Sequence, residues 1–219
     1  MDNTEIKTHI DAIIEKTFEV LKAVYKNQKE PKNKEQKTEH LFHVGSRIIF
    51  PKYSEKYRNG ETRLSEQELR FIFVEQFNDY CNNHQEMHWF YSVETPTEEK
   101  YQFSESGAKL EQPKKVDAGD KNGQSAMVDL AIHDEQLNRI ALIEFKALNP
   151  EASCFKKDFI KLSEEPTTLT YFIMYVRTHD AGTLNSLKLK VDSIGEKTKY
   201  CCYDLESGKR IESEIRTNQ

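Results

Sequence analysis

Two short apolar runs that carry charged residues constrain the fold of this chain more than any other feature. The first run, residues 125–133, reads SAMVDLAIH, and the second, residues 139–147, reads RIALIEFKA. Both have the length and the apolar content of a β-strand, and the polar stretch DEQLN between them is suited to a hairpin turn. The pattern therefore predicts two neighbouring strands.

Three charged residues of these strands are predicted to come together. Side chains alternate between the faces of a strand, so Glu144 and Lys146 point the same way while Phe145 points into the other layer. If the two strands pair antiparallel through the turn, Asp129 lies alongside Glu144. Two carboxylates and a carbonyl oxygen form the kind of site that Mg²⁺ prefers, and the lysine would face whatever the metal holds.

This arrangement resembles the PD-(D/E)XK nuclease superfamily, which includes restriction endonucleases, repair nucleases and phage-defence effectors. The signature is an acid on one strand, followed on the next strand by Asp or Glu, any residue and Lys. Here these positions are Asp129, Glu144, Phe145 and Lys146. The match covers residues 125–147 and extends loosely to segments around 65–81 and 153–164. The proline that names the motif is absent, and Val128 stands in its place.

The resemblance implies a fold and a reaction. The expected fold is α/β, with a mixed central sheet flanked by helices. The expected activity is Mg²⁺-dependent hydrolysis of phosphodiester bonds, with DNA favoured over RNA and with Mn²⁺ able to replace Mg²⁺. Asp129, Glu144 and the carbonyl of Phe145 are expected to hold the metal. Lys146 is expected to orient the attacking water or to stabilise the charge of the transition state.

A helix before the strands is predicted to add a fourth acid. Ser65 and Glu68 have the spacing of a capping box, so a helix is expected over residues 66–82. In the resembled family, a glutamate of this helix often reaches the metal. Because Glu68 already has a capping role, Glu75 is the predicted ligand and catalytic residue. The alternative is that Glu75 is a helix former that faces water.

The remaining elements complete the expected fold. Apolar residues recur at helical spacing from 4 to 27, with Thr4 as the cap, and a short helix is expected over 35–47. Residues 1–50 are interpreted as an N-terminal helical extension and residues 51–219 as the nuclease-like domain. Further strands are expected at 88–96, 100–104 and 170–177, with a parallel crossover through a helix after Ser153 and a closing hairpin made of 199–205 and 210–215.

Five lysines are predicted to contact nucleic acid. Residues 105–123 are rich in Gly and Lys and are expected to form a long loop that carries Lys114 and Lys115 toward a phosphate backbone. Lys156, Lys157 and Lys161 are expected near the exposed side of the following helix. The alternative for Lys114 and Lys115 is a disordered surface loop.

Composition excludes several classes of protein. The net charge of −5 is no basic signature for nucleic acid, although acids at a metal site attract phosphate once the cation is bound. No apolar stretch approaches the length of a membrane span and no signal peptide is visible, so a cytoplasmic protein that does not bind membranes is expected.

The four cysteines form no CxxC pair and are expected to be reduced. His84 and His88 lack the adjacent glutamate of a zinc protease.

Two other interpretations stay open. The chain could use a nuclease-like fold to bind nucleic acid or to assemble, without cleavage, and metal removal would then leave binding intact. It could also be an interaction protein with a chance motif, in which case Asp129→Ala should stabilise the fold through lost charge repulsion. A homodimer formed through the amphipathic N-terminal helix is a further hypothesis.

Overall fold

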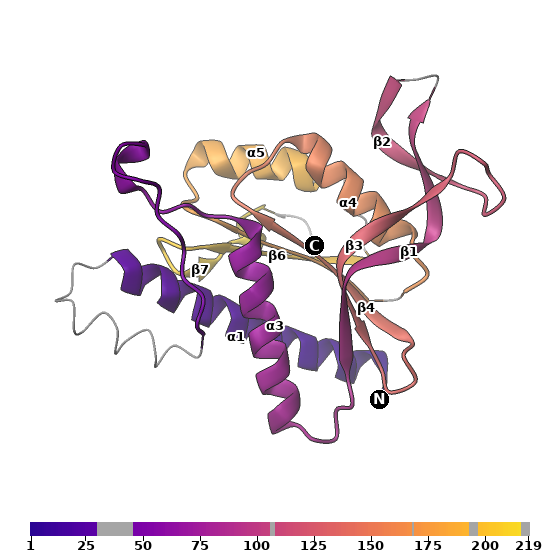
Figure 1. Ribbon diagram of the computed structural model, residues 1–219, viewed down its shortest axis with the longest axis horizontal. Coiled ribbons are helices and arrows are strands. Elements are labelled where there is room, and N and C mark those ends of the chain that lie inside the picture. Colours follow the sequence, from indigo (N-terminus) through magenta and orange to yellow (C-terminus); the bar gives the residue numbers. More distant parts are fainter. Residues whose placement is uncertain (30–45, 106–107, 168, 193–196, 216–219) are drawn as a thin grey trace.

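A seven-stranded mixed sheet lies at the centre of the computed structural model, with helices on both faces (Figure 1). The structure describes residues 1–29, 46–105, 108–167, 169–192 and 197–215. The helices are α1 (Asn3–Lys29), the 3-10 turn η1 (Arg58–Gly60), α3 (Glu66–Asn83), α4 (Ala152–Glu164), α5 (Ala181–Val191) and α6 (Glu212–Ile215). The strands are β1 (Phe90–Glu105), β2 (Ala108–Val116), β3 (Gln124–His133), β4 (Arg139–Ala147), β5 (Leu169–Val176), β6 (Thr198–Asp204) and β7 (Lys209–Arg210). The predicted α/β fold with a helix at the N-terminus is confirmed.

The sheet has an antiparallel half and a parallel half, in the order β2-β1-β3-β4-β5-β6-β7. β1 pairs antiparallel with β2 and β3, and β3 pairs antiparallel with β4. The chain then crosses through α4 to β5 and through α5 to β6, and both of these pairings are parallel. The predicted parallel crossover is confirmed, although its helix begins at Ala152, before Ser153. α5 is a helix that the sequence patterns do not reveal, because only Leu187 and Val191 of its residues are buried.

Each face of the sheet buries its own apolar cluster. On one face, α1 and α3 cover side chains that include Phe145 and Cys201. On the other face, α4 and α5 cover Phe172 and Cys202. The neighbours Cys201 and Cys202 thus point to opposite faces, as strand alternation predicts. Burial of each large apolar side chain contributes about 1.5–3 kcal/mol, so the two clusters hold both helical layers on the sheet.

The N-terminal helix belongs to the first of these clusters. α1 lies across the sheet (Figure 1), and its apolar stripe, which includes Ile13 and Phe18, is buried. Phe18 stacks on Tyr203 of β6 with ring centroids 4.8 Å apart. The apolar stripe of α1 is therefore buried within the chain. It does not offer the exposed surface on which the dimer hypothesis was based. In the part of the chain that the structure describes, no helix combines the length and apolar content needed to cross a bilayer.

Two predicted details of the N-terminal region have different outcomes. The prediction that Thr4 caps α1 is wrong: Asp2 Oδ1 accepts hydrogen bonds from the backbone N–H groups of Thr4 (2.7 Å) and Glu5 (2.9 Å). A carboxylate at the helix start is favoured by the helix dipole as well as by these bonds. The short helix predicted over 35–47 falls mostly on residues 30–45, which lie outside the described residues.

Residues 105–123 contain a strand, so the long loop predicted there is wrong. β2 pairs with the last part of β1, and cross-strand ion pairs join Lys114 to Glu105 (3.0 Å) and Lys115 to Glu99 (3.1 Å). β2 itself is polar, so hydrophobic alternation is too weak to identify it from sequence. The partner strand, rather than local propensity, decides its conformation.

Two further strand predictions change in detail. The strands predicted at 88–96 and 100–104 form one strand, β1, whose register with β3 shifts between those two parts. The second strand of the hairpin predicted over 210–215 is only two residues long. The short helix α6 follows it, because Ile211 and Ile215 turn into the second apolar cluster.

Candidate active site at the ends of strands β3 and β4

Strands β3 and β4 end their pairing at the point where the predicted acids lie. The last pair in their register is Leu130 opposite Ile143. At the next position, Asp129 Oδ2 accepts a hydrogen bond from the backbone N–H of Phe145 at 2.8 Å. A carboxylate therefore takes the place of a hydrogen bond between the strands. The predicted antiparallel pairing, which brings Asp129 alongside Glu144, is confirmed.

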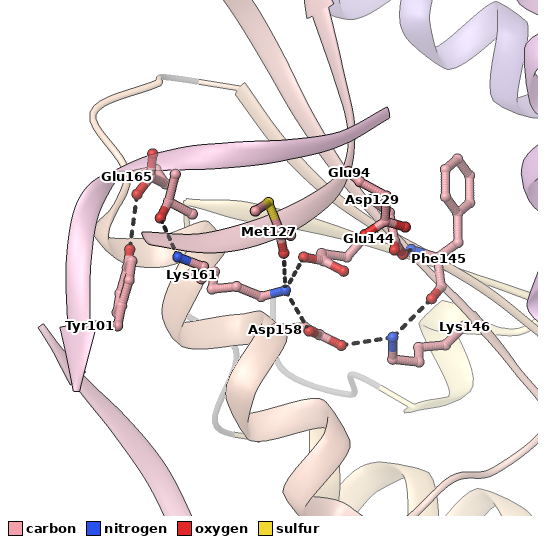
Figure 2. Close-up of polar contacts among 12 residues, drawn as sticks. Glu94, Tyr101, Met127, Asp129, Glu144, Phe145, Lys146, Asp158, Lys161 and Glu165 are labelled. Atoms are coloured by element: carbon pink, nitrogen blue, oxygen red, sulfur yellow. Dashed lines mark hydrogen bonds and ion pairs between the residues drawn. The ribbon is translucent and has the colours of Figure 1, made fainter. Parts of the chain in front are cut away.

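The alternation predicted for β4 is also confirmed. Phe145 packs in the first apolar cluster, with its ring centroid 5.4 Å from that of Phe73 of α3. Glu144 and Lys146 point to the other face, where both contact residues of α4 (Figure 2). The acid and the lysine are thus held between the sheet and a helix, with an apolar layer behind them.

Glu144 is a buried carboxylate with a lysine partner. The residue is 1% exposed, and its Oε1 accepts a hydrogen bond from Lys161 Nζ. Burial raises the pKa of Glu144 well above its ordinary range, and the nearby Asp158 raises it further, while Lys161 and Lys146 act in the opposite direction. An unpaired charge in this position would cost several kcal/mol, so the lysine is part of what allows the acid to be buried.

Lys161 lies inside the site, so the prediction that it lies near the exposed side of its helix is wrong. The residue is 8% exposed. Its ammonium group contacts three oxygen atoms: Oε1 of Glu144, Oδ1 of Asp158 (2.8 Å) and the carbonyl of Met127 (2.7 Å) (Figure 2). Burial lowers the pKa of Lys161, but Glu144 and Asp158 outweigh it and the pKa is raised. All three donors of Lys161 are used inside the site. A nucleic-acid contact for Lys161 stays a prediction.

Lys146 lies between the sheet and α4 and is also ion-paired. Its Nζ is 2.8 Å from Asp158 Oδ2 and 3.8 Å from Glu66 Oε2, and it donates to the carbonyl of Phe145 at 3.1 Å. Burial lowers the pKa of Lys146, but the charges of Asp158 and Glu144 outweigh it and hold the pKa above its ordinary value. Lys146 therefore carries a positive charge at neutral pH.

Asp158 joins the two lysines and is a site residue that sequence reasoning missed. One carboxylate oxygen contacts Lys146 and the other contacts Lys161, each at 2.8 Å, and the residue is 7% exposed. Asp158 and Lys161 stand three residues apart on α4, a spacing that places them on one helical face. That spacing is a signal in the sequence, but only the packing of α4 on the sheet shows that the face points inward.

Arg70 of α3 is a second residue that the sequence patterns do not reveal. Its guanidinium group lies 2.5 Å from Asp129 Oδ1 and 2.8 Å from Glu94 Oε1. Burial lowers the pKa of Arg70, and Asp129 and Glu94 raise it, with a net rise. Glu94 has a φ of 45° within β1, a left-handed conformation that is strained for a residue other than glycine. Arg70 thus ties Asp129 to a strained position on the neighbouring strand.

The acid that α3 brings to the site is Glu66. Its carboxylate is 3.8 Å from Lys146 Nζ, and burial raises its pKa. The predicted capping box is confirmed, because the N–H of Ser65 donates to Glu68 Oε2 at 3.0 Å. Glu75 follows Glu66 by nine residues, or two and a half helical turns. The two side chains therefore lie on opposite faces of α3, and Glu75 points away from the site. The assignment of Glu75 as a metal ligand stays a prediction.

The other four predicted lysines lie on nearby surfaces. Lys114 and Lys115 are exposed on β2, and Lys115 also lies 3.9 Å from Glu164 of α4. Lys156 and Lys157 are half-buried on α4. The strand and the helix that carry these lysines contact each other. A nucleic-acid contact for the four lysines stays a prediction.

The oxygen atoms of the predicted metal site fit a hard cation. Asp129, Glu144 and the Phe145 carbonyl offer only oxygen donors, which Mg²⁺ prefers. A cationic side chain contacts each of these three oxygen donors. The contacts are Arg70 to Asp129, Lys161 to Glu144 and Lys146 to the Phe145 carbonyl. Among the described residues, no three His, Cys, Asp or Glu side chains gather closely enough to hold a metal, but this set requires only two carboxylates and one carbonyl.

Comparisons with known proteins add no relative: a scan against protein-family models, a search of curated proteins and a search of solved structures each found no match.

Proposed function

We propose that this protein is a metal-dependent nuclease that hydrolyses phosphodiester bonds, with DNA as the favoured substrate. The observation that carries the proposal is the convergence of Asp129, Glu144 and Lys146 where β3 and β4 end their pairing. Burying acids and lysines together costs folding free energy, and such clusters are concentrated at functional sites. The strand order and the Glu-Phe-Lys spacing match the motif of the resembled superfamily.

In this proposal, Asp129, Glu144 and the Phe145 carbonyl hold Mg²⁺. When bound, Mg²⁺ polarises the scissile phosphate and lowers the pKa of an attacking water. Asp129 is oriented for this task by two contacts, one with Arg70 and one with the Phe145 N–H. Lys146 acts as a cation rather than as a base, because its raised pKa keeps it protonated. It stabilises the negative charge that develops on the phosphate oxygens.

The proposal is tested by cleavage of supercoiled plasmid, single-stranded DNA and RNA, each with Mg²⁺, Mn²⁺ or EDTA. Wild type is compared with Asp129→Asn and Lys146→Ala, and Glu135→Gln is the matched control. Glu135 is an exposed acid in the turn at the other end of the same two strands. Metal-dependent cleavage that both site variants lose, and that the control keeps, supports the nuclease. A folded wild type that cuts none of the substrates contradicts it.

The same assay decides between two glutamates of α3. Glu66 contacts Lys146, whereas Glu75 is the ligand that the sequence predicts. We expect Glu66→Gln to reduce cleavage more than Glu75→Gln does, because the carboxylate of Glu66 lies 3.8 Å from Lys146 Nζ. A larger loss for Glu75→Gln would support the prediction that Glu75 is the metal ligand.

The second candidate function is a nuclease-like protein that binds nucleic acid without cutting it. One observation favours it: Asp129 and Glu144 both have cationic partners from the protein itself, so the acids are charge-compensated without a metal. Under this alternative, wild type binds DNA or RNA equally well in EDTA and in Mg²⁺. Under the nuclease proposal, EDTA abolishes cleavage.

A further inference from the structure

The surroundings of Lys161 have the donor chemistry of a metal site. Its Nζ contacts a carboxylate oxygen of Glu144, a carboxylate oxygen of Asp158 at 2.8 Å and the carbonyl oxygen of Met127 at 2.7 Å (Figure 2). Two carboxylates and one carbonyl are the donor types that hard divalent cations take. An ammonium ion therefore lies in an oxygen-lined position of the kind that a metal ion uses.

Because Glu144 and Asp158 are buried, this ammonium stabilises their charged forms while no metal is bound. Glu144 is 1% exposed and Asp158 is 7% exposed, so water contributes little to the stability of either charge. A buried carboxylate without a cation is strongly unfavourable. Lys146 compensates Asp158 from the other side, but the partner in direct contact with Glu144 is Lys161.

We propose that Lys161 is a built-in counter-ion that competes with the divalent cation for Glu144 and thereby sets how tightly the protein binds metal. This inference rests on the metal site of the proposed function. Lys161 occupies Oε1 of Glu144, so a divalent cation either displaces the ammonium group from Oε1 or binds Oε2 next to a positive charge, and both weaken this ion pair. Lys161 remains compensated when this happens, because it keeps Asp158, one turn earlier on α4, and the Met127 carbonyl.

Under this exchange, the metal concentration decides whether Lys161 or the divalent cation is paired with Glu144. At low metal concentration the acids are paired within the protein, and the fold does not depend on a bound cation. At higher concentration the metal takes Glu144 and the ion pair weakens. The free energy that the pair loses is subtracted from the free energy of metal binding, so affinity is lower than the same oxygen atoms would give alone.

The test measures Mn²⁺ binding by calorimetry without nucleic acid, for wild type, Lys161→Met and Lys161→Gln. Lys161→Met removes the charge at similar length, and Lys161→Gln keeps a donor for the Met127 carbonyl. Lys199→Met is the control, because Lys199 is also paired with an acid, Asp11 at 2.6 Å, on a different part of the sheet. Circular dichroism with EDTA and with Mn²⁺ reports folding.

We expect both Lys161 variants to bind Mn²⁺ with a Kd about tenfold lower than that of wild type, or lower still, and the control to match wild type. A variant that is unfolded in EDTA but folds in Mn²⁺ also supports the inference, because the metal then replaces the ammonium. Unchanged or weaker Mn²⁺ binding by folded variants overturns it. So does a failure of both variants to fold in Mn²⁺.

Failure of this inference is distinguishable from failure of the proposed function. If wild type cuts DNA only with metal, but the Lys161 variants bind Mn²⁺ no more tightly, the nuclease stands and the counter-ion role falls. If the variants bind Mn²⁺ more tightly but wild type cuts nothing, the counter-ion role stands and the nuclease falls.

Discussion

The carboxylate of Asp129 accepts the backbone N–H of Phe145 at 2.8 Å, and this bond joins β3 to β4 where their regular pairing has ended. Asp129 therefore has a structural task as well as its proposed role at the metal. The same carboxylate also contacts Arg70 at 2.5 Å. The acid at the centre of the motif is thus held by two donors from two different elements.

Replacement of Asp129 should therefore destabilise the protein. Asp129→Ala leaves the Phe145 N–H without its acceptor and removes one of the two carboxylates that contact Arg70. We expect the free energy of unfolding to fall by about 2–4 kcal/mol, measured by urea denaturation in EDTA. The exposed control Glu135→Ala should change it by less than about 0.5 kcal/mol. A stabilised Asp129→Ala would instead favour the interpretation of a chance motif with repelling charges.

Lys146→Ala should lower the rate of metal-dependent cleavage by about 10²–10³-fold, the usual effect of removing one group that stabilises a transition state. The pKa of Lys146 is raised, so the side chain does not titrate near neutral pH. The ratio of wild-type to variant rate should therefore be constant between about pH 6 and 9. A ratio that grows with pH across this range would show that Lys146 acts as a base. Lys146→Arg, which keeps the charge, should retain part of the activity.

Glu144 should make stability depend on pH. Burial and the nearby Asp158 raise its pKa in the native state above the ordinary value of 4.5, so the native state binds a proton more tightly than the unfolded chain does. Its contribution to stability is fully present below about pH 4.5 and is lost as the pH rises through the raised pKa. Glu144→Gln removes this loss. The stability of the variant relative to wild type should increase from about pH 4 to pH 8 in EDTA. A constant difference in urea denaturation would contradict the raised pKa.

Glu165 should matter for stability and not for chemistry. It is buried, and it accepts hydrogen bonds from the N–H groups of Glu98 (2.8 Å) and Glu99 (3.2 Å) and from the hydroxyl of Tyr101 (3.0 Å). These hydrogen bonds connect β1 to the residue that follows α4. Glu165→Gln should lower the free energy of unfolding by about 1–3 kcal/mol, because an amide accepts fewer and weaker bonds. Cleavage per folded molecule should be unchanged.

The matched control for Glu165 is its neighbour. Glu164 is exposed and lies 3.9 Å from Lys115, so Glu164→Gln should change stability by less than about 0.5 kcal/mol. If the two substitutions lowered the free energy of unfolding equally, the buried hydrogen bonds of Glu165 would not stabilise the protein, and the prediction would be wrong.

Local patterns predicted a large part of the fold correctly. The strands that carry Asp129 and Glu144, the amphipathic face of α1, the capping box at Ser65 and the parallel crossover through α4 all follow from spacing and alternation. They could be predicted because hydrophobic periodicity and turn chemistry act over a few residues. Elements without such a pattern were missed: β2 is polar and α5 buries little, so only their partners decide them.

The sequence by itself determined that Glu144 and Lys146 share one face of a strand, because side chains alternate along a strand. The short turn between the two strands predicted that Asp129 comes beside them. Only the tertiary structure decided which residues of the helices complete the site. Asp158 and Lys161 point inward because α4 packs on the sheet with that face. Arg70 contacts Asp129 and Glu66 contacts Lys146 because of how α3 is turned about its axis. The docking of a helix depends on contacts distant in sequence, and no local spacing contains that information.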